Sequence, residues 1–115
     1  MTITIHGTGI ELTDAIKTYA EDKIGGLTKF FENIQRASID VGKRSNHHNK
    51  GDIFYAEVNV SIPGHVIRVV KEEPDLYKAI DKVKDHLKVD LEKIKEKMRT
   101  KDKKSIRASK EYQEE

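Results

Sequence analysis

The sequence predicts an α+β domain with the element order β-α-β-β-β-α, in which a four-stranded mixed sheet carries two helices packed side by side on one face. Three observations lead to this prediction. A long amphipathic helical stretch covers 74–101, alternating polar and apolar residues occur in three places, and a second helical stretch separates the first two of these. A strand–helix–strand beginning implies a parallel pair of strands, and the later strands form an antiparallel meander.

The first third of the chain predicts a strand and a helix. Residues 2–6 alternate polar and apolar, as a half-buried strand does. Thr13 suits a helix N-cap, and apolar residues keep helical spacing after it. Gly25 and Gly26 interrupt this stretch at a cost of about 2 kcal/mol relative to alanine. Because the apolar stripe stays in phase across the two glycines, we expect one helix over 13–31.

The middle of the chain predicts the other three strands. Residues 37–41 and 54–62 alternate, and 66–70 returns after a Pro63-Gly64 turn in which glycine supplies a positive φ. The segment 44–51 is polar and rich in turn formers. Apolar residues of both helices must then cover one face of the sheet, while the face carrying Tyr55, Glu57, Asn59 and Ser61 can stay in water.

The long helix has one apolar stripe and two basic flanks. Pro74 suits the first turn, and Asp75 complements the positive end of the helix dipole. The stripe consists of Leu76, Ile80, Val83, Leu87, Leu91, Ile94 and Met98. The His86 flank consists of Lys78, Lys82, His86, Lys93 and Lys97, and the Lys88 flank consists of Lys84, Lys88, Lys95 and Arg99. Four carboxylates lie between the flanks, opposite the stripe: Asp81, Asp85, Glu92 and Glu96.

Length and composition are typical of one water-exposed domain. The chain has 115 residues, of which 37% are charged, and no cysteine. A net charge of +2 does not itself indicate a nucleic-acid ligand, and residues 1–70 carry eight basic and eight acidic side chains. No segment has the pattern of a signal peptide or the length of a membrane span. We expect a cytoplasmic domain over 1–100, no membrane partner, and a disordered charged tail over 101–115.

The residue pattern offers little for catalysis or metal binding. No nucleophile–histidine–acid arrangement and no phosphate-binding glycine loop occurs, so we expect neither an enzyme nor a cofactor. His47 and His48 are adjacent and lack a third ligand at metal-site spacing, so we expect no metal. Asp81 is expected to face solvent, and Tyr77 to pack at the edge of the core with its hydroxyl in water.

The basic flanks admit two interpretations. They are either a solvated surface with acid–base pairs along the helix, or part of a two-helix ridge that follows phosphates. The ridge interpretation needs the lysines of the first helix, Lys17, Lys23 and Lys29, to lie near one flank of the second helix.

Several short motifs resemble the ribosome hibernation-promoting factor and ribosome-associated inhibitor family. The run Asp75-Leu76-Tyr77-Lys78-Ala79-Ile80-Asp81 is similar to the family signature D-[ML]-Y-x-A-I-D. Family motifs of the first strand and helix resemble Ile3-x-Ile5-x-Gly7, Ile10 to Lys17, and Lys23 to Phe31. The resemblance covers about 2–99 and implies a fold like a double-stranded-RNA-binding domain with an added first strand.

This resemblance implies a ribosome-binding translation inhibitor. Family members bind the small ribosomal subunit in the channel for messenger and transfer RNA, contact ribosomal RNA through basic residues of both helices, and preserve idle ribosomes in stress or stationary phase. By position, the implied RNA contacts are Lys17, Lys23, Lys78, Lys82, His86, Lys93 and Lys97. The expected partner is therefore the ribosome and not DNA, and the free protein is expected to be a monomer.

The sequence departs from the family at several contact positions. Members often carry lysine at Gly26, lysine at His86, arginine at Val89 and glutamine at Asp90. Long members also carry a C-terminal domain that pairs ribosomes; this chain ends where short members do, so we expect it not to bridge two ribosomes. Whether the tail reaches along the messenger RNA channel, as in some short members, or has no role stays open. The alternatives are a stand-alone binder of structured RNA and a protein-interaction module that uses the sheet face.

Overall fold

A computed structural model describes the backbone of residues 1–44 and 51–114 and the side chains of 1–44 and 51–99. The elements are β1 (Thr2–Thr8), α1 (Asp14–Gly25), the 3₁₀ helix η1 (Gly26–Lys29), β2 (Arg36–Arg44), β3 (Ile53–Ile62), β4 (His65–Glu73) and α2 (Leu76–Glu114). This order and the four-stranded mixed sheet confirm the predicted fold class.

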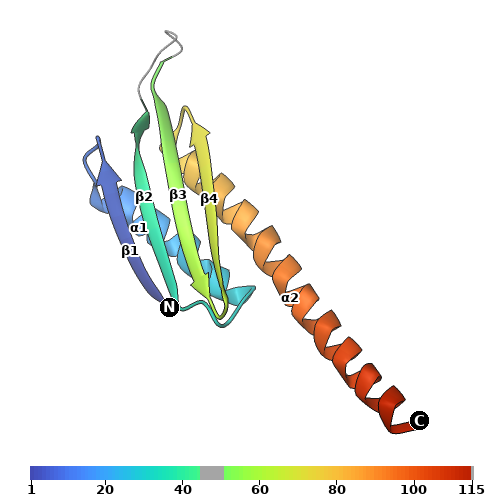
Figure 1. Cartoon of the computed structure of the whole chain (residues 1–115). Coiled ribbons are helices and arrows are strands. Elements are labelled where there is room, and N and C mark those ends of the chain that lie inside the picture. Colours follow the sequence, from blue (N-terminus) through green and yellow to red (C-terminus); the bar gives the residue numbers. More distant parts are fainter. Residues whose placement is uncertain (45–50, 115) are drawn as a thin grey trace.

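The sheet follows the chain order β1-β2-β3-β4. β1 runs parallel to β2, whereas β2, β3 and β4 form an antiparallel meander. Both helices lie behind the sheet in Figure 1, and α2 continues well past its lower end. The sheet therefore has one face covered by helices and one face open to water.

The core lies between the sheet and the helices. Alternation along β3 buries Ala56, Val58 and Val60 toward the helices, as the sequence predicted. The stripe of α2 faces them: Val83, Leu87 and Leu91 are fully buried. Tyr55, on the open face, is also buried, because its ring lies across Gly42 of the neighbouring strand.

The helix ends differ in part from the prediction. Thr13 caps α1, accepting a hydrogen bond from the backbone N–H of Ile16 at 3.2 Å. Asp75 caps α2 by accepting from the N–H of Tyr77 at 2.9 Å, so Pro74 precedes the helix instead of occupying its first turn. These two side chains satisfy backbone donors that a helix start otherwise leaves unpaired.

Three element lengths also differ. The helix expected over 13–31 ends at Gly25 and tightens into η1, since the glycine pair gives the backbone no side-chain support for a regular α-helix. β4 extends to Glu73 because its full length pairs with β3. Helix α2 continues through 101–114, where the sequence predicted a disordered tail; this segment lacks glycine and proline.

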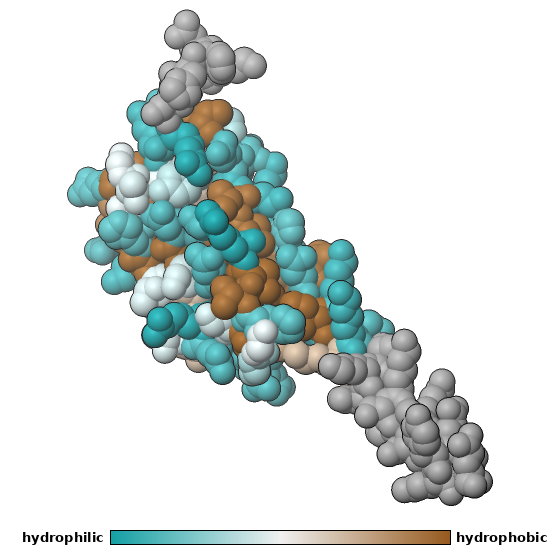
Figure 2. Space-filling model, in the orientation of Figure 1, coloured by the Kyte–Doolittle hydropathy of each residue, from teal (hydrophilic) through white to brown (hydrophobic). Residues whose placement is uncertain are grey.

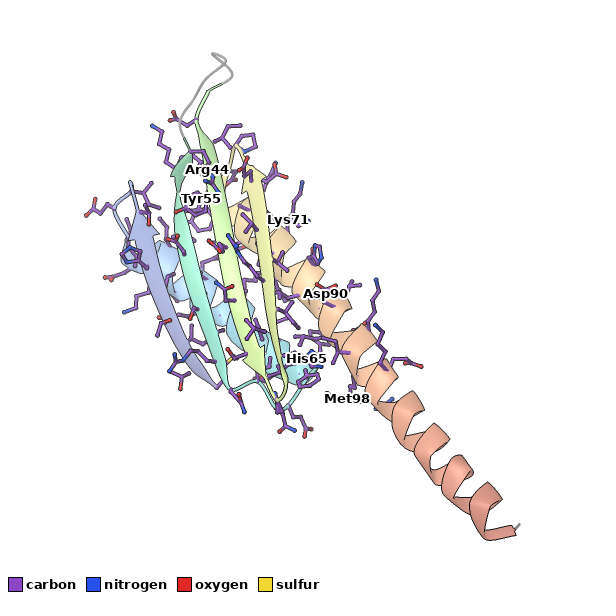
Figure 3. All side chains as sticks on the ribbon, in the orientation of Figure 1. Arg44, Tyr55, His65, Lys71, Asp90 and Met98 are labelled. Carbon is purple, nitrogen blue, oxygen red and sulfur yellow. The ribbon has the colours of Figure 1, made fainter. Side chains whose placement is uncertain are left out.

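The open face of the sheet is mixed in character. Figure 2 shows hydrophilic side chains around an apolar area near β4. Val66 contributes to this face with 70% of its surface exposed. At the other end of the strands, Arg44 lies over the Tyr55 ring, 4.4 Å from its centre (Figure 3).

Gly42 should tolerate no side chain. A Cβ there would lie 2.4 Å from the carbonyl oxygen of Thr8 and 2.6 Å from the Tyr55 ring. We expect Gly42→Ala to lower the free energy of unfolding by about 1–3 kcal/mol through overpacking. The measurement is chemical denaturation. Gly26→Ala is the control: no atom lies within 4 Å of that Cβ and φ is −64°, so stability should stay equal or rise by about 0.5 kcal/mol.

Candidate nucleic-acid interface

Burial of the apolar stripe gives the two flanks of α2 different neighbours. The His86 flank runs beside β4, where Lys82 forms an ion pair with Glu73. The Lys88 flank runs beside α1 and η1, where the Lys88 ammonium lies 4.7 Å from the centre of the Phe30 ring. The flanks are thus no longer equivalent, although helical spacing alone made them so.

The His86 flank and β4 enclose a shallow hollow of about 480 Å³. Its lining residues are Lys71, Lys82, Asp85, His86, Val89, Asp90 and Lys93. Figure 3 shows Lys71 on β4 and Asp90 on α2, at the two sides of this hollow. The hollow therefore brings three of the predicted contact residues together with Lys71, which the sequence reasoning did not select.

The hollow is basic but contains its own counterions. His86 Nε2 lies 3.3 Å from Asp90 Oδ2, one helical turn further along. Lys82 pairs with Glu73, whose side chain is only 16% exposed. Lys93 is exposed on the same flank. The strand predicted over 66–70 stops one residue before Lys71. In the structure β4 continues to Glu73, and Lys71 points to the helix-covered side of this edge strand, so a longer predicted strand would have identified it.

The remaining predicted residues lie outside the hollow. Lys78 and Lys97 are exposed near the two ends of the same flank. Lys17 is exposed on α1, and Lys23 is half-buried at the contact between α1 and α2.

A cluster of four residues joins α1 to α2. The Tyr19 hydroxyl donates a 2.6 Å hydrogen bond to Asp81 Oδ1, and Lys23 Nζ lies 3.8 Å from the same oxygen. The Tyr77 ring meets the Tyr19 ring edge-on, with 4.9 Å between centroids. Asp81 therefore serves the helix contact while 43% of its side chain stays exposed, so the solvent-facing position that the sequence predicted is only part of its role.

The basic side chains near α1 meet the Lys88 flank of α2 and not the His86 flank. Because α1 and η1 lie on the side of the Lys88 flank, Lys29 at the end of η1 lines a second hollow with Lys95 and Arg99, together with Glu92 and Glu96. Lys17 and Lys23 are separated from the His86 flank by the carboxylate row that begins at Asp81. The basic surface is therefore divided into two areas.

The described side chains include no group of three His, Cys, Asp or Glu residues that could hold a metal ion. His47 and His48, weighed as metal ligands, lie outside the described residues. Within the part of the chain that the structure covers, no helix is both long and apolar enough to cross a membrane.

Sequence comparison places this geometry in a known family. The family described as "Sigma 54 modulation protein / S30EA ribosomal protein" matches residues 3–99, which include all strands and the packed part of α2. The chain belongs to this family. The match confirms the resemblance seen in the sequence motifs. In the structure, the first residue of the signature, Asp75, caps α2, and the last, Asp81, contacts α1.

Named relatives are similar over most of the chain. A "Ribosome hibernation promoting factor" of Acidithiobacillus ferridurans is 37% identical over 81 residues, which are 70% of this chain and all of that protein. A "Ribosome hibernation promotion factor" of Deinococcus radiodurans is 31% identical over 91 residues, 79% of this chain. The match spans only 47% of the Deinococcus protein, so this chain corresponds to about half of it.

Two solved structures share the fold. The N-terminal domain of Thermus thermophilus Protein Y is 32% identical with a TM-score of 0.69, covering 82% of this chain and 99% of that domain. A ribosomal subunit interface protein from Coxiella burnetii is 26% identical with a TM-score of 0.71, covering 83% of this chain and 98% of that one. The arrangement of sheet and helices is therefore shared.

The helix contact should be visible in a pH titration. The hydrogen bond to Asp81, with burial and the nearby negative charge, raises the pKa of Tyr19 from 10.0 to about 12. The contribution of the neutral phenol to stability is then fully present below about pH 10 and is lost as the pH rises toward 12. Subtracting the tyrosinate absorbance curve of Tyr19→Phe from that of the wild type should leave a transition near pH 12. A transition centred at pH 10 would contradict this assignment.

Proposed function

We propose that this chain is a ribosome hibernation factor. It binds the small ribosomal subunit in the channel for messenger and transfer RNA, inhibits translation, and stabilises idle ribosomes under stress or in stationary phase. Support comes from membership of the S30EA family and from relatives named as hibernation factors that match most of this chain. In this proposal the protein acts in the cytoplasm as a monomer. It inhibits translation by occupying the channel, and it uses neither catalysis nor a cofactor.

The observation that carries this proposal is the basic hollow between β4 and the His86 flank. It concentrates Lys71, Lys82 and Lys93 on a rigid helix and strand edge. Folded ribosomal RNA presents phosphates in a fixed pattern, and lysines on rigid elements can match such a pattern by shape without reading bases. The remaining proposed contacts are Lys78, His86 and Lys97 on the same flank of α2, and Lys17 and Lys23 on α1, which lie beyond the carboxylate row that begins at Asp81.

Three of the four departures from the family pattern, His86, Val89 and Asp90, fall inside the same hollow. Val89, where members often carry arginine, is 47% exposed in the lining, and Asp90 pairs with His86. Compared with the family pattern, Val89 removes one cation and Asp90 adds one anion. The flank as a whole therefore attracts phosphate less strongly. Lys71 offsets part of this loss from the β4 side.

The sheet-face alternative has less support. Tyr55, its most prominent side chain, is only 7% exposed. Its hydroxyl donates to Asp40 Oδ2 at 3.0 Å, and Arg44 covers its ring. A partner on this face would find Tyr55 already engaged within the sheet. In the other alternative, the protein is a stand-alone RNA binder whose ligand is bare structured RNA and not the assembled ribosomal subunit. This alternative predicts tight binding to bare RNA duplexes.

Charge reversal on α2 tests the binding surface. We expect Lys82→Glu/Lys93→Glu to lower the fraction of protein that co-sediments with small ribosomal subunits by at least about tenfold, because attraction to several phosphates becomes repulsion. The matched control is Lys95→Glu/Arg99→Glu, which makes the same change of charge on the Lys88 flank. Control binding should stay within about threefold of the wild type. Equal losses in both variants would contradict the assignment to the His86 flank, and a wild type that stays in the supernatant at low salt would refute the ribosome proposal.

A further inference from the structure

We propose that Glu73 and Asp81 determine which RNA the proposed contact lysines bind. Each carboxylate holds one of the proposed contact lysines, Lys82 or Lys23, in an internal ion pair. In this way the carboxylates weaken binding to RNA in general more than binding to the ribosomal surface. This inference rests on the proposed function and adds the residues that separate the cognate RNA from other RNA.

The two pairs bring together elements that are distant in sequence. Glu73 ends β4 and reaches the side chain of Lys82 on α2, and its own side chain is 16% exposed. Asp81 on α2 reaches Lys23 on α1, with side-chain exposures of 43% and 39%. Each lysine is exposed enough to meet a phosphate but starts from a position beside a carboxylate.

Neither carboxylate can easily move away with its lysine. Asp81 also accepts the 2.6 Å hydrogen bond from the Tyr19 hydroxyl, so it stays at the helix contact when Lys23 turns outward. Glu73 belongs to a strand that pairs with β3 along its full length. A phosphate that takes either lysine therefore lies near a fixed negative charge, which opposes binding at short range.

Other proposed contacts lack such partners. Among the side chains that the structure describes, no carboxylate oxygen lies within 4.0 Å of Lys17, Lys78 or Lys93. The proposed contact residues thus divide into unpaired lysines and lysines that a carboxylate holds. This division is not visible in the net charge of +2 or in the spacing along α2.

The division produces selectivity because the two kinds of RNA engage different numbers of lysines. A regular duplex is a cylinder and contacts only some of these lysines at one time, so its binding is weak. The free energy needed to open one internal ion pair is then a large fraction of its total binding free energy. A shaped ribosomal surface that engages the unpaired lysines together can offset the same repulsion. Discrimination then comes from a repulsive element that acts against the wrong ligand.

The experiment removes both carboxylates while keeping their shape. Glu73→Gln/Asp81→Asn is compared with the wild type for binding to a fluorescent 20-base-pair RNA duplex of mixed sequence, by anisotropy between about 50 and 200 mM salt. We expect duplex affinity to rise about tenfold and the slope of log K against log salt to steepen by about 2, one for each released lysine. Affinity for isolated small subunits should rise less than about threefold, so that selectivity falls.

The control makes the same change in net charge elsewhere. Glu11→Gln/Glu32→Gln replaces two exposed carboxylates that have no cation within 4.0 Å among the described side chains. Its duplex affinity should change less than about threefold, with an unchanged salt slope. Circular dichroism checks that both variants fold.

Two results would overturn the inference: equal duplex gains in the two double variants, or equal gains on duplex and small subunit in Glu73→Gln/Asp81→Asn. Either can occur while the wild type still co-sediments with small subunits, which leaves the proposed function standing. If the wild type does not co-sediment, the proposed function fails whatever the duplex shows.

Discussion

Burial of the α2 stripe against the sheet is the constraint on which the rest of this structure depends. Val83, Leu87 and Leu91 are fully buried between α2 and the strands. Removing that much apolar surface from water is the dominant stabilising effect, and it fixes the rotation of the helix about its axis. With the stripe on the sheet and α1 packed beside α2, the His86 flank runs along β4 and the Lys88 flank along α1. The position of the proposed binding surface is therefore a consequence of core packing.

The same packing sets the chemistry of each flank. Beside β4, Lys82 meets the carboxylate of Glu73, and beside α1 the Tyr19–Asp81 hydrogen bond meets Lys23. A chain with nearly balanced charge can thus present unpaired lysines to one ligand and keep others neutralised. This arrangement explains how a chain with a net charge of only +2 can bind ribosomal RNA, the highly charged partner in the proposed function.

Local patterns predicted the fold well because they report local physics. Alternation over 54–62 and the cap at Thr13 require only near neighbours in the chain, and both were confirmed. The contact between Tyr19 and Asp81 joins residues 62 positions apart, and no spacing rule indicates such a pair. Helical spacing likewise gave two equivalent flanks, since the choice of which one meets α1 is made by the side-by-side packing of the helices over a twisted sheet. Spacing along the chain could therefore predict which residues share a flank of α2, but not which neighbours each flank meets.

The most direct test of the central claim is to map which face of the protein lies against ribosomal RNA. The chain has no cysteine, so Lys93→Cys on the His86 flank and Ser61→Cys on the open sheet face each provide a unique attachment point for a tethered hydroxyl-radical source. Bound to small subunits, the position 93 probe should cut RNA strongly around the messenger and transfer RNA channel, and the position 61 probe should cut it weakly. Stronger cutting from position 61, or none from position 93 in a protein that co-sediments, would contradict the account.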